Sequence, residues 1–158
     1  MKVLCILQNQ WANNPDQLNA LYAKYPGKRN EIIARLLFRG SLTGQRIESV
    51  FGDMMKEHAF IFDEASTTIT KASSSSPHYN AGHVRETILR VRPDVVIAFG
   101  HSSQRAIVDV RSAKRIRINL PPVIECVHPA IQKPGWMKQM CDAKKSLRQL
   151  IKQQPIAA

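Results

Sequence analysis

Residues 93–100 read Pro-Asp-Val-Val-Ile-Ala-Phe-Gly, and they give the clearest indication of the fold class. Residues 94–99, Asp-Val-Val-Ile-Ala-Phe, predict a strand that is apolar on both faces, which is typical of a central strand in a parallel sheet, because helices cover both faces of such a strand. Pro93 ends the helical pattern before it, and Gly100 permits a tight turn into a helix that we expect at 102–110. A buried strand followed at once by a helix is the building unit of a parallel α/β sheet.

The same alternation continues on both sides of this stretch. Residues 2–7 and 123–127 are short apolar runs rich in β-branched side chains, and each predicts a buried strand. Residues 59–62 and 67–70 are further candidates, and we place a strand around 67–70 in the sheet. Residues 115–120 alternate basic and apolar side chains, which favours a half-exposed strand.

Helical patterns fill the intervals between these strands. Asn14-Pro15 is typical of a helix start, with the Asn as cap and the Pro at the first helical position, and Asn30 is expected to cap the next helix. The serine tract at 73–77 predicts a surface loop. Apolar side chains recur at helical spacing in 31–37, 43–58, 81–91, 102–110 and 135–152.

These elements predict one α/β domain over residues 1–158. We expect a three-layer αβα sandwich whose central sheet has four mostly parallel strands, with helices on both faces.

Composition excludes several classes of protein. With 158 residues, 44% hydrophobic and 22% charged, the chain is typical of one domain with an ordinary core. No run approaches the ~20 apolar residues of a membrane span, and residues 1–7 are too short for a signal peptide. The three cysteines lack metal-site spacing, so we predict no metal and no cofactor. We expect a cytoplasmic monomer.

The charge indicates a polyanionic partner. Lys and Arg number 23 against 12 Asp and Glu, a formal net charge of +11. Such an excess on a small domain favours nucleic acid, and we predict DNA. The alternative is a set of solvated basic helix faces without a partner. The basic side chains are densest in residues 24–46, 105–117 and 133–152.

Polar side chains directly follow three of the predicted strands. Gln8 and Asn9 follow the first strand, His101 and Ser102 follow Gly100, and His128 follows the last strand. Because the carboxyl ends of parallel strands meet at one edge of a sheet, where ligands of such folds bind, we expect these residues to converge.

Taken in order, these segments resemble motifs of the uracil-DNA glycosylase superfamily. Asn9 stands where the mismatch-specific and single-strand-selective branches carry a catalytic Asn, and residues 38–45, Phe-Arg-Gly-Ser-Leu-Thr-Gly-Gln, resemble a segment of the thermostable iron–sulfur branch. Residues 93–100 resemble the family's strand and glycine turn, and His128-Pro129-Ala130 resembles its final motif. The resemblance covers most of the chain and is that of a diverged member without the iron–sulfur cysteines.

The resemblance implies a monofunctional DNA glycosylase, a repair enzyme that hydrolyses the N-glycosidic bond of uracil or of a modified or mismatched base flipped out of DNA. It implies that Asn9 positions water and that His128 donates a hydrogen bond to the departing base. Phe38 would stack on the base, with Gln8 and Thr68 beside it. The implied DNA-binding residues are Gly100, His101, Ser102, Pro129, Ala130, Ile131, Gln132 and Lys133.

Each of these residues also has a plainer interpretation. Asn9 is compatible with a turn after a strand, His128 with a hydrogen bond inside its loop, and Phe38 with the core. His101 is compatible with a helix cap or a phosphate contact.

Two other functions remain open for the whole chain. One is a glycosylase-like protein that binds DNA without cutting it. The other is a small-molecule nucleotide-binding or transferase domain of flavodoxin-like type, which the absence of a Gly-rich phosphate loop disfavours. Gln10 stands where the family has Pro, and no Asp or Glu lies in the loop of Asn9, so the sequence leaves the identity of the base undecided.

Overall fold

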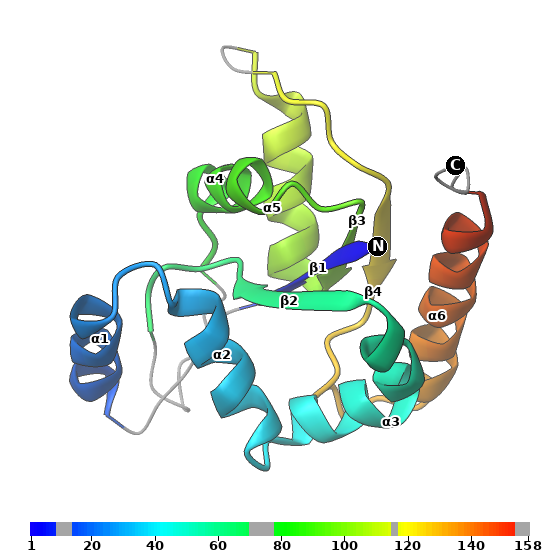
Figure 1. Ribbon diagram of the computed structural model, residues 1–158, viewed down its shortest axis with the longest axis horizontal. Coiled ribbons are helices and arrows are strands. Elements are labelled where there is room, and N and C mark those ends of the chain that lie inside the picture. Colours follow the sequence, from blue (N-terminus) through cyan, green and yellow to red (C-terminus); the bar gives the residue numbers. More distant parts are fainter. Residues whose placement is uncertain (9–13, 70–77, 115–116, 154–158) are drawn as a thin grey trace.

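Four parallel strands form the sheet at the centre of the computed structural model, which describes residues 1–8, 14–69, 78–114 and 117–153 (Figure 1). The strands are β1 (Lys2–Leu7), β2 (Ala59–Glu64), β3 (Val95–Phe99) and β4 (Val123–Cys126), in the order β2-β1-β3-β4. All neighbours run parallel. The predicted α/β class is confirmed, and β3 is buried along its whole length, as its apolar sequence requires.

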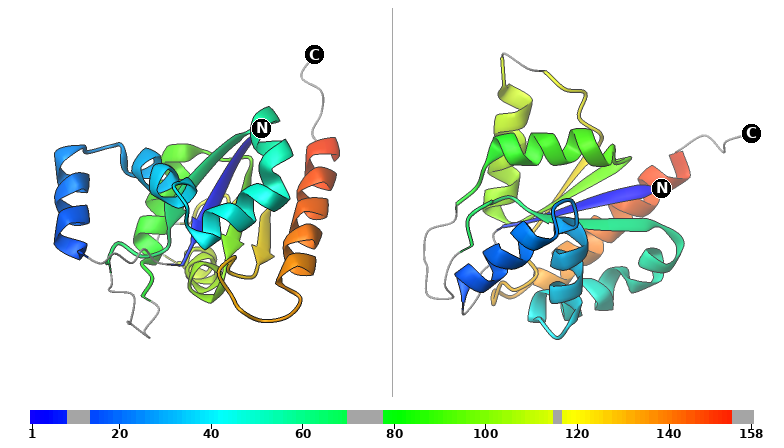
Figure 2. Two further views of the ribbon diagram at one scale, coloured as in Figure 1. Left: turned by 90° about the horizontal axis from the view of Figure 1, so that it is seen from below. Right: turned by 60° about the vertical axis from the view of Figure 1, so that its left-hand side comes forward.

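Helices cover both faces of this sheet (Figures 1 and 2). Alternate side chains of the strands point to opposite faces, so Val3, Cys5 and Leu7 join one core and Leu4 and Ile6 join the other. The first core is closed by α2, α3 and α6, and the second by α4 and α5. The helices within the described ranges are α1 (Pro15–Lys24), α2 (Arg29–Phe38), α3 (Leu42–Glu57), α4 (Ala81–Val91), α5 (His101–Ser112) and α6 (Trp136–Gln153).

The first predicted helix cap is confirmed and the second is wrong. Asn14 Oδ1 accepts a hydrogen bond from the Gln17 N–H at 3.2 Å, with Pro15 at the first helical position. Asn30 lies inside α2, whose cap position is Lys28. Its side-chain amide instead donates to the Phe62 carbonyl at 2.7 Å, which ties α2 to β2.

The second strand of the sheet lies earlier than residues 67–70. β2 pairs with β1 from Lys2 opposite Ala59 to Leu7 opposite Glu64. After it, the Ser66 hydroxyl accepts from the Thr68 N–H at 3.0 Å and turns the chain away. The Thr-rich stretch has strand propensity, but the edge of β1 that it would need is already paired with β2.

A strand at 115–120 is also not found in its described part, residues 117–120. Ile118 and Leu120 pack against the second core without pairing to the sheet, which accounts for the alternating pattern. Residues 115–116 and the serine tract lie outside the described residues. No helix in the described ranges is long and apolar enough to cross a membrane.

Candidate functional site

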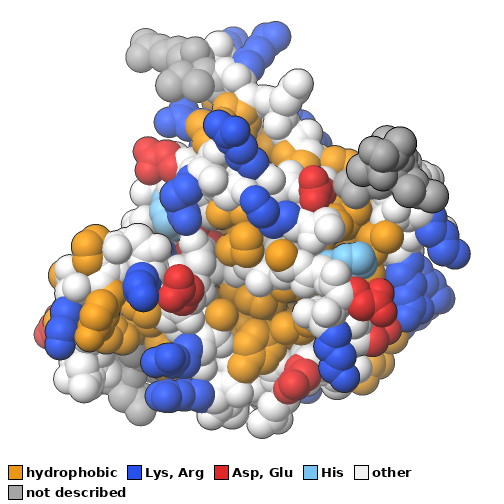
Figure 3. Space-filling model, viewed as in Figure 1, with side chains coloured by type: hydrophobic (Ala, Val, Ile, Leu, Met, Phe, Trp, Pro, Cys, Tyr) orange, Lys and Arg blue, Asp and Glu red, His pale blue; other side chains and the backbone are white. Residues whose placement is uncertain are grey.

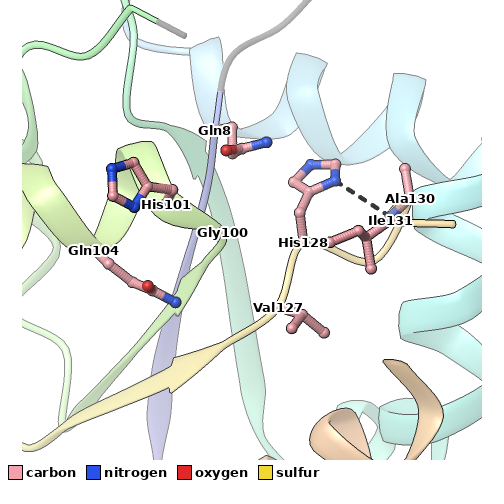
Figure 4. Close-up of a pocket in the computed structure, with 8 residues that line it drawn as sticks. All are labelled: Gln8, Gly100, His101, Gln104, Val127, His128, Ala130 and Ile131. Atoms are coloured by element: carbon pink, nitrogen blue, oxygen red, sulfur yellow. Dashed lines mark hydrogen bonds between the residues drawn. The ribbon is translucent and has the colours of Figure 1, made fainter. Parts of the chain in front are cut away.

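The carboxyl ends of β1, β3 and β4 meet at a cavity of about 390 Å³. Gln8 follows β1, Gly100 follows β3 and His128 follows β4 by two residues, and Figure 4 shows the Gln8 side chain directed toward the His128 ring. The structure therefore brings these three predicted residues together. The cavity is lined by Gln8, Gly100, His101, Gln104, Val127, His128, Ala130 and Ile131.

Gly100 makes this close approach of three strand ends possible. Its φ of +85° lies in a region that L side chains rarely adopt, and its N–H donates to the Cys126 carbonyl at 2.8 Å. A Cβ at this position would lie 2.8 Å from the Gln8 side chain and 2.9 Å from the His128 Cβ. The glycine is thus required both by the turn into α5 and by the packing of its neighbours.

The imidazole of His128 is held in one orientation by its own loop. Its Nδ1 accepts a hydrogen bond from the Ala130 N–H at 3.2 Å, and the Ile131 N–H donates to the His128 carbonyl at 3.0 Å. An Nδ1 that accepts carries no proton, so in the neutral ring the proton is on Nε2. Burial lowers the pKa of His128 to about 4, which keeps the ring neutral at physiological pH.

Arg46 on α3 braces the loop that carries His128. Its guanidinium donates to the Pro129 carbonyl at 2.6 Å and to the Ile131 carbonyl at 2.8 Å. The same group lies 4.0 Å from the centroid of the Trp136 ring, a cation–π contact with the start of α6. The loop is therefore fixed between α3 and α6.

A second cavity of about 520 Å³ also includes His128 in its lining. Its walls are mostly aliphatic and come from β1, α2 and the start of α3, and its polar side chains include Glu64 at the carboxyl end of β2. Glu64 is only 6% exposed, and its Oε2 has no hydrogen-bond partner. Burial raises the pKa of Glu64 to about 8, ionised Asp63 adds to the rise and Arg29 opposes it.

The neighbouring Asp63, unlike Glu64, is surrounded by polar partners for its carboxylate. Its Oδ1 accepts from Arg29 Nε at 3.1 Å, and its Oδ2 accepts from the Thr87 hydroxyl at 2.7 Å and lies 3.2 Å from His83 Nε2. Burial alone would raise its pKa, but His83, Thr87 and Arg29 outweigh burial and hold the pKa of Asp63 at about 2. Asp63 is a structural anion that joins α2, β2 and α4.

Other predicted site residues lie apart from these cavities or outside the described residues. Asn9 belongs to the stretch 9–13 that is not described. Phe38 ends α2 and packs edge to face on Phe62, with ring centroids 5.2 Å apart, and lines neither cavity. Thr68 is exposed in the turn beyond β2, and Ser102 is buried with its hydroxyl unpartnered.

The remaining predicted DNA-binding residues lie close to His128 along the chain. Pro129 is buried in the loop that Arg46 braces, and Gln132 lines the second cavity. Lys133 lies in a shallow hollow beside Trp136.

Glu64 was not predicted from the sequence, although a signal for it is present. The apolar stretch that forms β2 places Phe60, Phe62 and Glu64 on the same face, because side chains alternate along a strand. An acid at the third of these positions, directly at the strand end, is unusual on a face that is otherwise core.

The described residues offer little to a metal ion. No group of three or more His, Cys, Asp or Glu side chains in those ranges is arranged to hold one. Cys5 and Cys126 are buried thiols, and burial raises the pKa of Cys126 to about 12.

Comparison of the sequence with models of known protein families gives no match, and comparison with curated protein sequences gives no significant match. The site geometry and the sequence motifs are therefore the basis for a functional proposal.

Proposed function

We propose that this protein is a DNA glycosylase that hydrolyses the N-glycosidic bond of a base flipped out of DNA. The observation that carries the proposal is His128, a neutral imidazole at the carboxyl edge of the sheet whose Nε2–H is directed by the Ala130 hydrogen bond. The order of the motifs that resemble the uracil-DNA glycosylase superfamily supports it. The four-stranded parallel sheet is compatible with a glycosylase-like fold.

The chemistry requires a donor at the departing base. Cleavage of the bond passes through an oxocarbenium-like sugar and leaves the base with negative charge. The hydrogen bond from a fixed donor strengthens as that charge develops. Loss of such a donor typically costs ~2.7–4 kcal/mol of transition-state stabilisation. His128 Nε2–H fills this role while neutral, so no proton has to be taken up first. Asn9, by resemblance, positions the attacking water.

The loop after His128 has a further role in this proposal. The target base has to leave the stack before it can enter a cavity, and a protein segment fills the gap. Residues 130–134 follow the His128-Pro129 pair, and Arg46 holds this loop at the Pro129 and Ile131 carbonyls, so these residues provide the wedge in this proposal.

Incubation of the purified protein with labelled oligonucleotides tests the proposal. The panel contains uracil, hypoxanthine and other modified or mismatched bases in single and double strands, and alkaline cleavage detects abasic sites. We expect excision of at least one base by the wild type. DNA binding without excision from any substrate would instead support the glycosylase-like binding protein.

A further inference from the structure

Glu64 is a buried carboxyl group whose side chain has no hydrogen-bond or ion-pair partner among the described residues. It is 6% exposed, its Oε2 has no hydrogen-bond partner, and none of the ion pairs among the described residues includes it. Its neighbour Asp63 contacts the nearby polar side chains, namely Arg29, His83 and Thr87. Asp63 thus links β2 to α2 and α4 through its side chain, and Glu64 makes no such link.

The strand register directs Glu64 into the second cavity. Leu7 on β1 is paired with Glu64, so both lie on the face covered by α2 and α3, while Asp63 lies on the face of α4. Leu7, Ile33 and Leu37 form aliphatic walls around the carboxyl. At about 520 Å³ the cavity is within the size range of small-molecule sites, which combine apolar walls with few convergent polar groups.

The cavity favours the uncharged form of this carboxyl. An isolated buried carboxylate is costly, and the ionised Asp63 next to it increases that cost. His128, on the loop after β4, lines the cavity with Glu64, and the charges that act on Glu64 are Asp63 next to it on β2 and Arg29 on α2. Arg29 is bonded to Asp63 and offsets only part of the cost of a charge on Glu64, and neutral His128 offsets none of it.

We propose that Glu64, as a neutral carboxylic acid, reads the edge of an uncharged heterocyclic base held in this cavity, so that base binding is lost when Glu64 ionises. This inference rests on the proposed function and assigns the base-reading group. A neutral carboxyl offers an O–H donor beside a carbonyl acceptor, which matches a base edge that has an acceptor beside a donor. A carboxylate offers acceptors only, so it would face the base carbonyl with an unpaired charge.

Binding of free bases separates this inference from excision. Saturation-transfer NMR with uracil and with hypoxanthine, one pyrimidine and one purine, is performed on the full chain at pH 6.5 and pH 9. The variants are Glu64→Gln, which keeps a donor and an acceptor without titrating, and Glu64→Leu, which keeps the volume. Glu57→Gln, an exposed acid at the end of α3, is the matched control. Circular dichroism checks that each variant is folded.

For the wild type we expect binding at pH 6.5 that weakens about tenfold at pH 9, because the binding-competent neutral fraction falls by that factor. Glu64→Gln is expected to bind without this extra weakening, and Glu64→Leu is expected to lose binding at both pH values. Ionisation of the free base affects all variants alike, so the comparison between variants isolates Glu64.

Three results would overturn the inference. They are equal pH dependence in the wild type and Glu64→Gln, wild-type affinity in Glu64→Leu, and no base binding by the wild type at pH 6.5. Excision from oligonucleotides together with any of them would leave the glycosylase proposal intact. Glu64-dependent base binding without excision would support the base-reading role of Glu64 and contradict the glycosylase proposal.

Discussion

At the residue scale, Glu64 and His128 line one cavity and burial favours the uncharged form of both. The pKa of Glu64 rises to about 8 and that of His128 falls to about 4, because each group loses hydration of its ionised form. Between these values the cavity contains a neutral acid and a neutral imidazole. Both are hydrogen-bond donors, which suits a ligand rich in carbonyl oxygens.

Glu64 also makes stability depend on pH. Its folded pKa is raised, so between about pH 4.5 and pH 8 the folded chain binds a proton that the unfolded chain has released, and stability falls as pH rises. We predict that Glu64→Gln gains stability relative to the wild type across this window, by at most ~1.4 kcal/mol per pH unit. Urea unfolding of both proteins at several pH values measures the difference, and a constant difference would contradict the prediction. His128 titrates equally in both proteins, so its contribution cancels in the difference between their free energies of unfolding.

The two residues also show what the sequence allows at this scale. His128 was predictable, because a His directly after an apolar strand in a parallel fold falls at the ligand-binding edge. Its protonation state was not, since the tautomer depends on the Ala130 N–H and the pKa on burial. Glu64 is not predictable in the same way. With a strand expected around 67–70, residue 64 lies before that strand, so the sequence does not assign its side chain to a face of the sheet.

At the scale of elements, the turn from β3 into α5 holds the site together. We predict that Gly100→Ala is destabilised more than Gly27→Ala. Both glycines have positive φ, +85° and +83°, but a Cβ at Gly27 meets nothing within 4 Å while one at Gly100 meets Gln8 and His128. The positive φ costs ~1–3 kcal/mol at either position, and overpacking adds ~1–3 kcal/mol at Gly100. Denaturant unfolding measures both, and equal losses would argue against the close packing of the three strand ends.

The contact of α3 with the His128 loop gives a second prediction. Arg46→Ala removes the donor to two loop carbonyls and the contact with Trp136, so we expect a loss of ~1.5–3 kcal/mol in stability and faster amide exchange at Ala130 and Ile131. Arg46→Lys keeps the charge but not the fork of donors, so intermediate exchange is expected. Hydrogen exchange followed by NMR measures this. Unchanged protection of the Ala130 amide in Arg46→Ala would show that the loop does not need the brace.

Helices and strands with a clear hydrophobic pattern are predictable from the sequence. Those whose position depends on pairing with another strand or helix are not. The strand after Pro93 and the helix Ala81–Val91 follow from hydrophobic spacing alone. The choice between 59–64 and 67–70 depends on which stretch reaches β1 in register, and this is decided by tertiary structure. Asn30 likewise lies within α2 because the Phe62 carbonyl provides its partner.

At the scale of the whole molecule, basic side chains are spread over the surface near α1, α4, α5 and α6 (Figure 3). Part of this charge is neutralised: Lys144 and Arg148 pair with Asp53, and Lys138 and Lys145 pair with Asp142. Arg105, Arg111, Lys114 and Arg117 have no acidic partner among the described residues. These four are therefore available to an external polyanion.

We predict DNA binding that weakens steeply with salt, because lysine and arginine contacts release counterions condensed on the phosphates. Charge reversal of Lys133, beside the proposed wedge, is expected to weaken binding more than reversal of Lys56 at the end of α3. Fluorescence anisotropy with a labelled duplex at several salt concentrations measures both effects. Affinity that does not change with salt would contradict the electrostatic account of DNA binding.

If His128 donates to a departing base, its loss slows excision, and the measurement is the single-turnover excision rate of wild type and His128→Ala on the best substrate of the oligonucleotide panel. We expect the rate to fall about 10²–10³-fold, from removal of one fixed donor, with DNA affinity largely retained. His78→Ala, an exposed His that lines neither cavity, serves as control and is expected to excise at nearly the wild-type rate. Excision by His128→Ala at the wild-type rate, or no excision by the wild type from any substrate, would contradict the account.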